Sequence, residues 1–353
     1  MLFVTDPVLL ARKVGPDATR RAMQTIRDGG HILVGDDGGD LLAAAQARLA
    51  GDRSIEGVVL LGGVDVVPSR ITDAVPAELQ GLPGLKSLRL KERDRLQVWS
   101  DDAYGDLNGD GAPEFPVSRI PDGGDPTLLL GALALPPARP WPGRIGGLRN
   151  AKRPFADLVY RNLDANGRMY RSASDIPEMP PYPLTNCDHL YLVLHGNWHE
   201  GTVLRGEDED GYPEAFSTRD IPNPAPQIVF SGCCYGALCA TQVARDAQPG
   251  APQQGRTAAD SLALAFLKNG TRAFVGCTAV HYSPDLEPST YLGEPMHRYF
   301  WEAVAAGIPP AKALYLAKVK YAVGIPHRIG DKPELAIFEH KILRQFVCLG
   351  LGW

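Results

Sequence analysis

The sequence has few cysteines, no excess of basic residues and no long apolar run. Six cysteines in 353 residues, irregularly spaced, do not form the disulfide framework of a small secreted protein. The chain has a formal net charge of −5 and so lacks the excess of basic residues that non-specific nucleic-acid binding needs. We therefore expect no nucleic-acid partner. No stretch approaches the roughly 18 apolar residues that span a bilayer, so we expect no membrane association either.

The first residues, "MLFVTDPVLLARK", lack a basic start, and Asp6 and Pro7 interrupt their apolar run. They therefore make a poor signal peptide. With the low cysteine content, this predicts a soluble, cytoplasmic protein whose thiols stay reduced and free to react.

Short apolar runs alternate with helix-like segments along the chain, and 44% of the residues are apolar. Residues 31–37 ("HILVGDD") and 56–63 ("EGVVLLGG") are typical of buried parallel strands, and residues 40–52 between them of a helix. This βαβ pattern predicts an α/β fold with a mostly parallel central sheet flanked by helices.

Four prolines in "LALPPARPWPGR" (residues 133–144) indicate a linker. We therefore expect a smaller α/β subdomain over 1–133, a linker over 134–143 and a second domain over 144–353. In this domain we expect strands at 189–196, 226–234 and 271–279, and helices at 257–270, 294–307 and 311–323. Thr257 and Asp260 form the capping box that would begin the first of these helices.

Chemistry-bearing residues follow two of the expected strands. His195-Gly196 closes one strand and Cys233-Cys234 closes the next. Parallel strands gather such groups at one edge of the sheet, and a thiol beside an imidazole can carry out nucleophilic acyl transfer. Gly196 and Gly232 would let a substrate carbonyl approach backbone N–H donors.

Other interpretations use the same residues. Either cysteine is also typical of a small buried hydrophobe, and His-Gly of a turn. His195, His199, Cys233 and Cys234 could supply four zinc ligands, although adjacent cysteines are awkward chelators.

The order of three further segments along the chain is informative. They are "VVLLGGVDVVPSR" (58–70), "WSDDAYGDLNGDGAPEFPVSRIP" (99–121) and "GCTAVHYSP" (276–284). Together with the order strand-His-Gly, then strand-Cys, they resemble the caspase–gingipain clan of cysteine peptidases, and most closely its gingipain-like branch. The chain departs from that pattern at Ser118, where the family usually has glycine.

The resemblance implies a caspase-like fold, with His195 as the base, Cys234 as the nucleophile and the N–H groups of Gly196 and Cys234 as the oxyanion hole. Strand alternation sends the side chains of Cys233 and Cys234 to opposite sides, so only one can serve. Some family members carry an acidic residue after the first catalytic-domain strand. Residues 144–155 ("RIGGLRNAKRPF") contain no carboxylate, so we expect a Cys-His dyad.

The same loop implies a specificity. In this family it helps to form the pocket for the residue before the cut, and here it offers Arg149, Lys152 and Arg153, with Tyr282 on the loop that walls the pocket. A basic pocket favours an acidic substrate residue over Arg or Lys. Asp157 would reverse that preference if its side chain points inward. If these loop residues are instead solvated surface charges, they would give the enzyme no preference.

Two acidic segments remain. Asp106, Asn108 and Asp110 alternate and are followed by Glu114, which resembles the oxygen-ligand spacing of a calcium loop without the full EF-hand pattern. A plain turn rich in Asp and Gly is the alternative. "RGEDEDGYPE" (205–214) is typical of a solvated surface loop, or of a regulatory cleavage site.

The sequence as a whole predicts a cysteine endopeptidase that acts on protein or peptide substrates through a thioester and needs no cofactor, apart from the calcium option. Activation by a protein partner or by proteolysis stays open. A competing hypothesis is an inactive caspase-like scaffold that binds partners through the same groove. Labelling of Cys234 that depends on His195 would favour the enzyme.

Overall fold

A computed structural model describes residues 1–35, 39–136, 143–167, 169–172, 183–207, 211–248, 250–284, 291–329 and 332–353. Most of the expected linker, the end of the first expected strand (Asp36 and Asp37) and the centre of the acidic loop (residues 208–210) lie outside these ranges.

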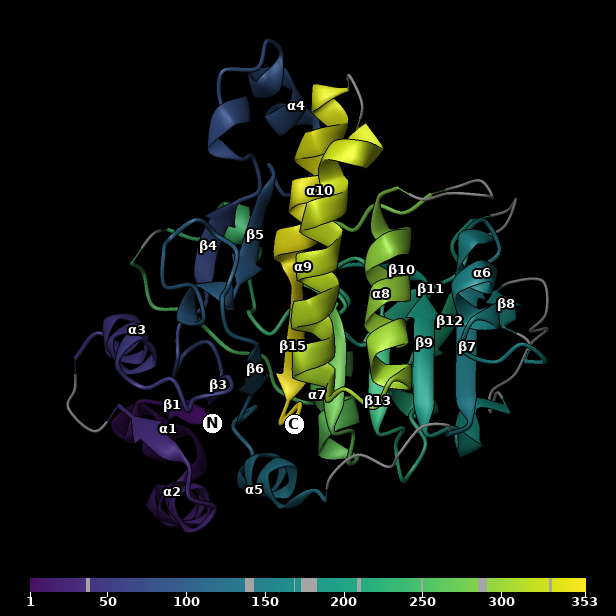
Figure 1. The fold of residues 1–353 in the computed structure, drawn as a ribbon. Coiled ribbons are helices and arrows are strands. Elements are labelled where there is room, and N and C mark those ends of the chain that lie inside the picture. The colour runs from purple at the N-terminus through teal and green to yellow at the C-terminus, as the bar shows by residue number, and fades with distance from the viewer. Residues whose placement is uncertain are drawn as a thin grey trace.

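One ten-stranded sheet runs through the described residues (Figure 1), in the order β2-β1-β3-β6-β15-β14-β13-β9-β7-β8. Its strands are β1 Leu2–Val4, β2 Ile32–Val34, β3 Val58–Leu61, β6 Val117–Ile120, β7 Ile145–Asn150, β8 Tyr170–Ser172, β9 His189–Val193, β13 Ile228–Ser231, β14 Ala273–Cys277 and β15 Phe346–Gly350. Smaller sheets comprise β10 His195–Gly196, β11 Val203–Arg205 and β12 Glu214–Ser217, and β4 Arg70–Asp73 with β5 Gln97–Ser100.

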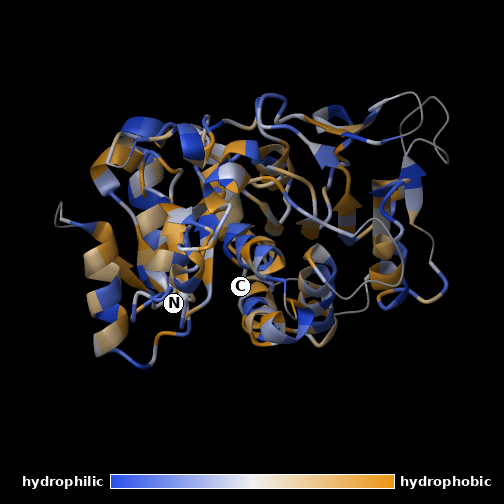
Figure 2. Ribbon diagram, turned by 90° about the horizontal axis from the view of Figure 1, so that it is seen from above, coloured by the Kyte–Doolittle hydropathy of each residue, from blue (hydrophilic) through white to orange (hydrophobic). Residues whose placement is uncertain are grey.

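Helices flank the sheet, as the view from above shows (Figure 2). They are α1 Pro7–Val14, α2 Pro16–Asp28, α3 Leu41–Gly51, α4 Leu85–Lys91, α5 Pro126–Ala134, α6 Phe155–Arg161, α7 Leu262–Lys268, α8 Gly293–Ala305, α9 Pro310–Ile329 and α10 Pro333–Gln345. The predicted mixed α/β architecture, with a mostly parallel central sheet between helices, is confirmed.

The sheet contains two parallel blocks that run in opposite directions. β15 pairs parallel with β6 but antiparallel with β14. The carboxyl ends of β7, β9, β13 and β14 therefore meet at one edge, the upper one in Figure 1. Because β6 and β15 come from the two expected domains, those domains share a single sheet.

Alternating residues of the strands build two cores, one on each face. On β9, Leu190 and Leu192 pack with α7, whereas Tyr191 and Val193 pack with α8 and α9. Side chains of a central parallel strand are buried on both faces, which explains the continuous apolar runs in the sequence.

One local prediction is wrong. The helix expected from residue 257 begins at Leu262, where Ser261 caps it through the N–H of Leu264; Thr257 and Asp260 bond to each other in a separate turn. β2 and β3 are parallel strands connected through the helix α3, as expected. In the sheet, β1 lies between them. A three-residue strand is too short to give a periodic signal.

Polar residues of the 99–121 segment form buried contacts with one another and with the C-terminal part of the chain. Arg119, which is 1% exposed, forms a two-pronged ion pair with Asp101 at 2.8 and 2.6 Å. Asp102 accepts two hydrogen bonds from Lys318 of α9. Ser118, the departure from the family pattern, donates to the carbonyl of Leu351 and so holds the chain beyond β15.

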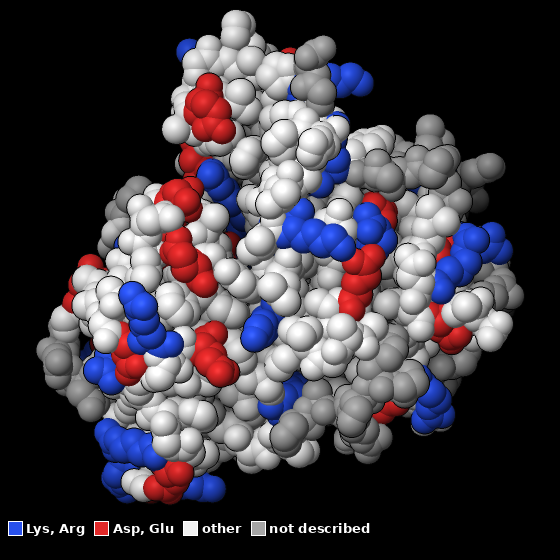
Figure 3. Space-filling model, in the orientation of Figure 1, with Lys and Arg blue, Asp and Glu red and all other residues white. Residues whose placement is uncertain are grey.

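On the face seen in Figure 3, acidic and basic side chains are interspersed. Among the described helices, none combines the length and apolar character needed to cross a membrane.

Candidate functional site

The two adjacent cysteines, which lie two and three residues beyond the end of β13, have different surroundings. Cys233 is fully buried in the core on the α7 side, where its sulfur accepts from the N–H of Leu194 at 3.2 Å. Burial raises the pKa of the Cys233 thiol to about 12. Cys233 is therefore a structural thiol.

Cys234 is half-buried and faces the loop after β14. Its sulfur accepts from the N–H of His281 at 3.3 Å and lies 3.7 Å from the carbonyl oxygen of the same residue. Burial raises the pKa of the Cys234 thiol, while the His281 N–H and the charge of Lys341 act in the opposite direction. A base is therefore needed to produce the thiolate near neutral pH.

The backbone amide of Cys234 is available, whereas those that follow it are used. Tyr235 has a positive φ of 57° and donates its N–H to Ala279, and Gly236 donates to Cys233. Among the described residues, the N–H of Cys234 has no acceptor. It can therefore serve the oxyanion role expected of it.

The role expected of Gly232 is wrong. Its N–H donates to Leu192 at 2.8 Å, and a β-carbon there would lie 2.3 Å from the ring of His297. Gly232 therefore makes room for a buried side chain, not for a substrate.

Gly196 brings the two predicted motifs together. A β-carbon added to Gly196 would lie 1.9 Å from the carbonyl oxygen of Cys234. The His-Gly and Cys-Cys segments, 37 residues apart at their nearest, therefore touch at the carboxyl ends of β9 and β13. In the described part of the chain no hydrogen bond joins Cys234 to the His195 ring, whose partners lie elsewhere.

The half-buried ring of His195 contacts three residues. Its Nε2 lies 2.8 Å from Glu207 Oε2 and 2.7 Å from Asn150 Nδ2, and Tyr212 packs edge-on with ring centroids 5.1 Å apart. Asn150 ends β7, at the place where some family members carry the acidic residue. The carboxylate itself comes from Glu207, beyond β11.

Behind Cys234 runs a chain of buried polar side chains. His281 Nε2 lies 3.0 Å from His297 Nε2, and His297 Nδ1 lies 2.8 Å from the hydroxyl of Tyr191. Burial lowers the pKa of His281 to about 3 and that of His297 well below its usual range. Both rings are therefore neutral, and they hold in place the loop that contacts the thiol.

The predicted substrate pocket is only partly available. Arg149 is buried and forms a two-pronged pair with Asp157 at 2.8 and 2.7 Å, with further bonds to two backbone carbonyls. The expectation that Arg149 or Asp157 offers a charge to a substrate therefore does not fit the structure. Sequence could not show the pairing, because it depends on how α6 follows β7.

Arg153 and Lys152 lie on the same loop, and the charge of Arg153 acts on the site. Lys152 is exposed, whereas Arg153 is half-buried, and its charge acts to lower the pKa of Cys234, His281 and Glu207. Tyr282 follows the residue that contacts Cys234. Its hydroxyl donates to Glu92, and its ring packs against Phe338 at 4.8 Å.

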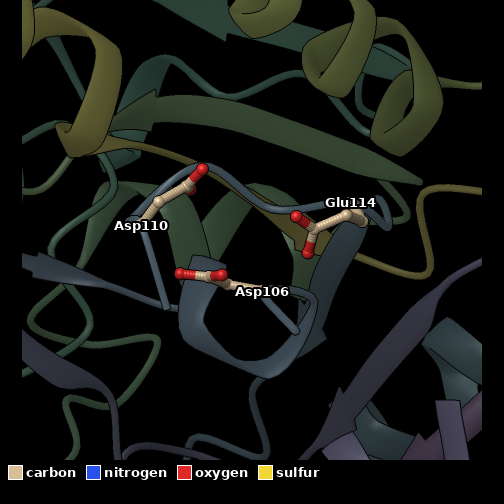
Figure 4. A group of neighbouring side chains, drawn as sticks. All are labelled: Asp106, Asp110 and Glu114. Carbon is tan, nitrogen blue, oxygen red and sulfur yellow. The ribbon is translucent and has the colours of Figure 1, made fainter. Parts of the chain in front are cut away.

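The four residues of the zinc interpretation do not converge. The sulfur of Cys233 bonds to the N–H of Leu194 in the core, and the exposed ring of His199 lies tilted against Trp198 with centroids 3.4 Å apart. The His/Cys/Asp/Glu group found among the described residues is Asp106, Asp110 and Glu114, whose oxygens lie within 4.8 Å of one another (Figure 4).

The calcium-like loop already uses its carboxylates internally. Asp106 accepts from the N–H groups of Gly109 and Gly111, and Glu114 accepts from Asn108 and from the N–H of Leu107. The loop thus holds the ligand atoms together, and a calcium site there stays a prediction.

Comparison with known proteins gives the fold. No family model and no curated protein matches the sequence. One solved structure, called "Structure of Protease", is similar over 100% of this chain and 77% of its own, with a TM-score of 0.57 and 13% identity. At that identity the likeness shows a shared fold, and the arrangement is consistent with the caspase-like fold that the motifs resemble.

Proposed function

We propose that the protein is a cysteine endopeptidase in which Cys234 is the nucleophile and His195 the base. The observation that carries this proposal is the close contact of Gly196 with the carbonyl of Cys234, which places the imidazole-bearing and thiol-bearing strand ends side by side. The name of the structure that shares the fold agrees with a peptidase.

The proposed cycle uses groups already described. His195 takes the proton of Cys234, and the thiolate attacks the peptide carbonyl to form a tetrahedral oxyanion. The N–H of Cys234, with that of Gly196, stabilises the oxyanion, each donor contributing on the order of 10²–10³ in rate. The amine leaves with the proton from the imidazolium, and His195 then activates the water that hydrolyses the thioester.

We further propose a preference for an acidic residue before the cut. Arg149 is neutralised by Asp157, so Arg153 is the basic residue of the predicted pocket whose charge acts on Cys234. A single guanidinium selects carboxylates by charge and by its paired N–H donors. We also propose that the loop of Asp106, Asn108, Asp110 and Glu114 binds calcium with a structural role.

The test uses purified protein and fluorogenic peptides that end in Asp, Asn, Arg or Lys. We expect turnover that is lost in Cys234→Ala and kept in Cys233→Ala. Loss of turnover in Cys233→Ala alone would identify Cys233, and not Cys234, as the nucleophile. The absence of turnover in every condition, including added calcium and limited proteolysis, would favour the inactive scaffold.

A further inference from the structure

Two described residues between β11 and β12 contact His195. The residues that connect the two strands supply both Glu207, at 2.8 Å from His195 Nε2, and Tyr212, whose ring packs edge-on against the imidazole. These contacts leave Nδ1 as the ring nitrogen without a partner among the described residues.

Backbone packing fixes the position of Glu207. A β-carbon added to Gly206 would lie 2.2 Å from the hydroxyl oxygen of Ser172, so the backbone runs directly against the end of β8. The N–H of Gly206 donates to Pro213 across the hairpin at 2.9 Å. The backbone next to Glu207 is therefore held in place, which favours one orientation of the Glu207 side chain.

Asn150 supports the same carboxylate. The N–H of Lys152 donates to Asn150 Oδ1 at 2.8 Å, which turns the amide nitrogen toward Glu207 Oε2 at 3.1 Å and toward His195 Nε2 at 2.7 Å. Because an amide nitrogen only donates, Asn150 donates to Glu207, and not to His195, when Nε2 carries a hydrogen. Asn150 thus occupies the position of the family's acidic residue but acts as a donor to a carboxylate that arrives from another loop.

We infer that Glu207 is the positioning residue for His195: it accepts the hydrogen of Nε2 and so leaves Nδ1 to take the proton of Cys234. This inference rests on the proposed function. In the proton transfer, the S–H bond of Cys234 breaks, an N–H bond forms at Nδ1, and the carboxylate of Glu207 stays ionised opposite the imidazolium.

The charge state of Glu207 agrees with this role. The hydrogen bond from His195, together with that from Asn150 and the charge of Arg153, holds the pKa of Glu207 below its usual 4.5, against the effect of burial. The support is therefore present above pH 4.5 and is lost only as the pH falls through the lowered pKa.

The test measures how fast iodoacetamide alkylates Cys234 in the full chain, by mass spectrometry at pH 7, in wild type and in His195→Ala, Glu207→Gln and Glu207→Gln/Asn150→Asp. We expect Glu207→Gln to slow alkylation about tenfold or more and the double variant to recover most of it, because the second substitution would restore a carboxylate beside Nε2. Glu200→Gln, an exposed glutamate paired with Arg205, is the matched control. With a peptide substrate, Glu207→Gln should lower kcat and leave KM unchanged.

The outcomes separate the two proposals. If His195→Ala slows alkylation and Glu207→Gln does not, the role of Glu207 is overturned and the Cys-His site stands. If His195→Ala has no effect, the proposed site itself fails. Slowing in Glu207→Gln that the added Asn150→Asp substitution does not relieve would make Glu207 a merely structural residue and would also overturn the inference.

Discussion

Gly196 approaches the carbonyl oxygen of Cys234 so closely that no side chain fits between them, with 1.9 Å from an added β-carbon to that oxygen. We predict that Gly196→Ala pushes the His195 strand end away from Cys234, costs about 1–3 kcal/mol in the free energy of unfolding, and slows alkylation of Cys234. Urea unfolding and mass spectrometry measure the two effects. Gly131→Ala, on α5 where the added carbon meets open space, should leave alkylation unchanged and raise the free energy of unfolding by about 0.5–1 kcal/mol, because alanine favours a helix over glycine. Unchanged alkylation in Gly196→Ala would mean that the approach is not needed for reactivity.

The two cysteines should differ sharply in reactivity. At pH 8 we expect iodoacetamide to modify Cys234, which is half-buried, and to leave Cys233 untouched, because Cys233 is fully enclosed and burial raises its pKa to about 12. Peptide mapping after labelling gives the answer. Modification of Cys233 in the folded protein would contradict the assignment of the nucleophile.

Arg153 should set the substrate preference. We predict that Arg153→Ala lowers kcat/KM for a peptide that ends in Asp by about fivefold relative to one that ends in Asn, since a rim charge contributes about 1 kcal/mol. Lys152→Ala, the exposed neighbour, is the control. If the ratio of kcat/KM for the Asp peptide to that for the Asn peptide is the same in both variants, Arg153 does not belong to the substrate pocket.

The Arg119–Asp101 pair should be important for stability. Burial alone would raise the pKa of Asp101, but the charge and hydrogen bonds of Arg119 outweigh it and keep the pKa below 3.8. The pair therefore stabilises the fold above pH 3.8, and the contribution is lost as the pH falls through the lowered value. Asp101→Asn should cost about 3–5 kcal/mol at pH 7, because it leaves a buried guanidinium without a carboxylate.

Urea unfolding at several pH values checks this prediction. The penalty should shrink below pH 3.8, and Asp17→Asn, which changes an exposed carboxylate paired with Arg20, should show almost none. A penalty for Asp101→Asn that stays constant with pH would point to packing and not to charge.

Calcium should raise the melting temperature. At about 100 times the dissociation constant, a bound ion adds about 2.7 kcal/mol of stability. Glu114→Gln removes one of the three carboxylates and should weaken the effect, whereas Glu334→Gln, an exposed residue on α10, should not. A melting temperature that does not respond to calcium would leave the loop as an internally bonded turn.

Sequence patterns located much of this molecule for identifiable reasons. The continuous apolar runs predict β3, β9, β13 and β14, because a central parallel strand is buried on both faces. The shared direction of β9 and β13 places His195 and Cys234 at one edge.

The contacts that sequence could not predict depend on how separate elements pack. Glu207 reaches His195 because β10, which contains His195, pairs with β11, and Arg149 of β7 meets Asp157 because of how α6 packs beside that strand. β15 pairs with β6 at Leu349 and Arg119, which are 230 residues apart. No local periodicity reports such a partner.

That central strand also bears on how the protein folds. β15 follows every other strand of the sheet in the sequence, yet it lies between β6 and β14 and is the element that joins the two parallel blocks. Until β15 docks, each block exposes an unpaired edge. Its pairing with β6 has the largest sequence separation, and so the largest loop-closure cost, of the strand pairings in this sheet. Folding should therefore be slow, and an intermediate without β15 should aggregate through those two edges.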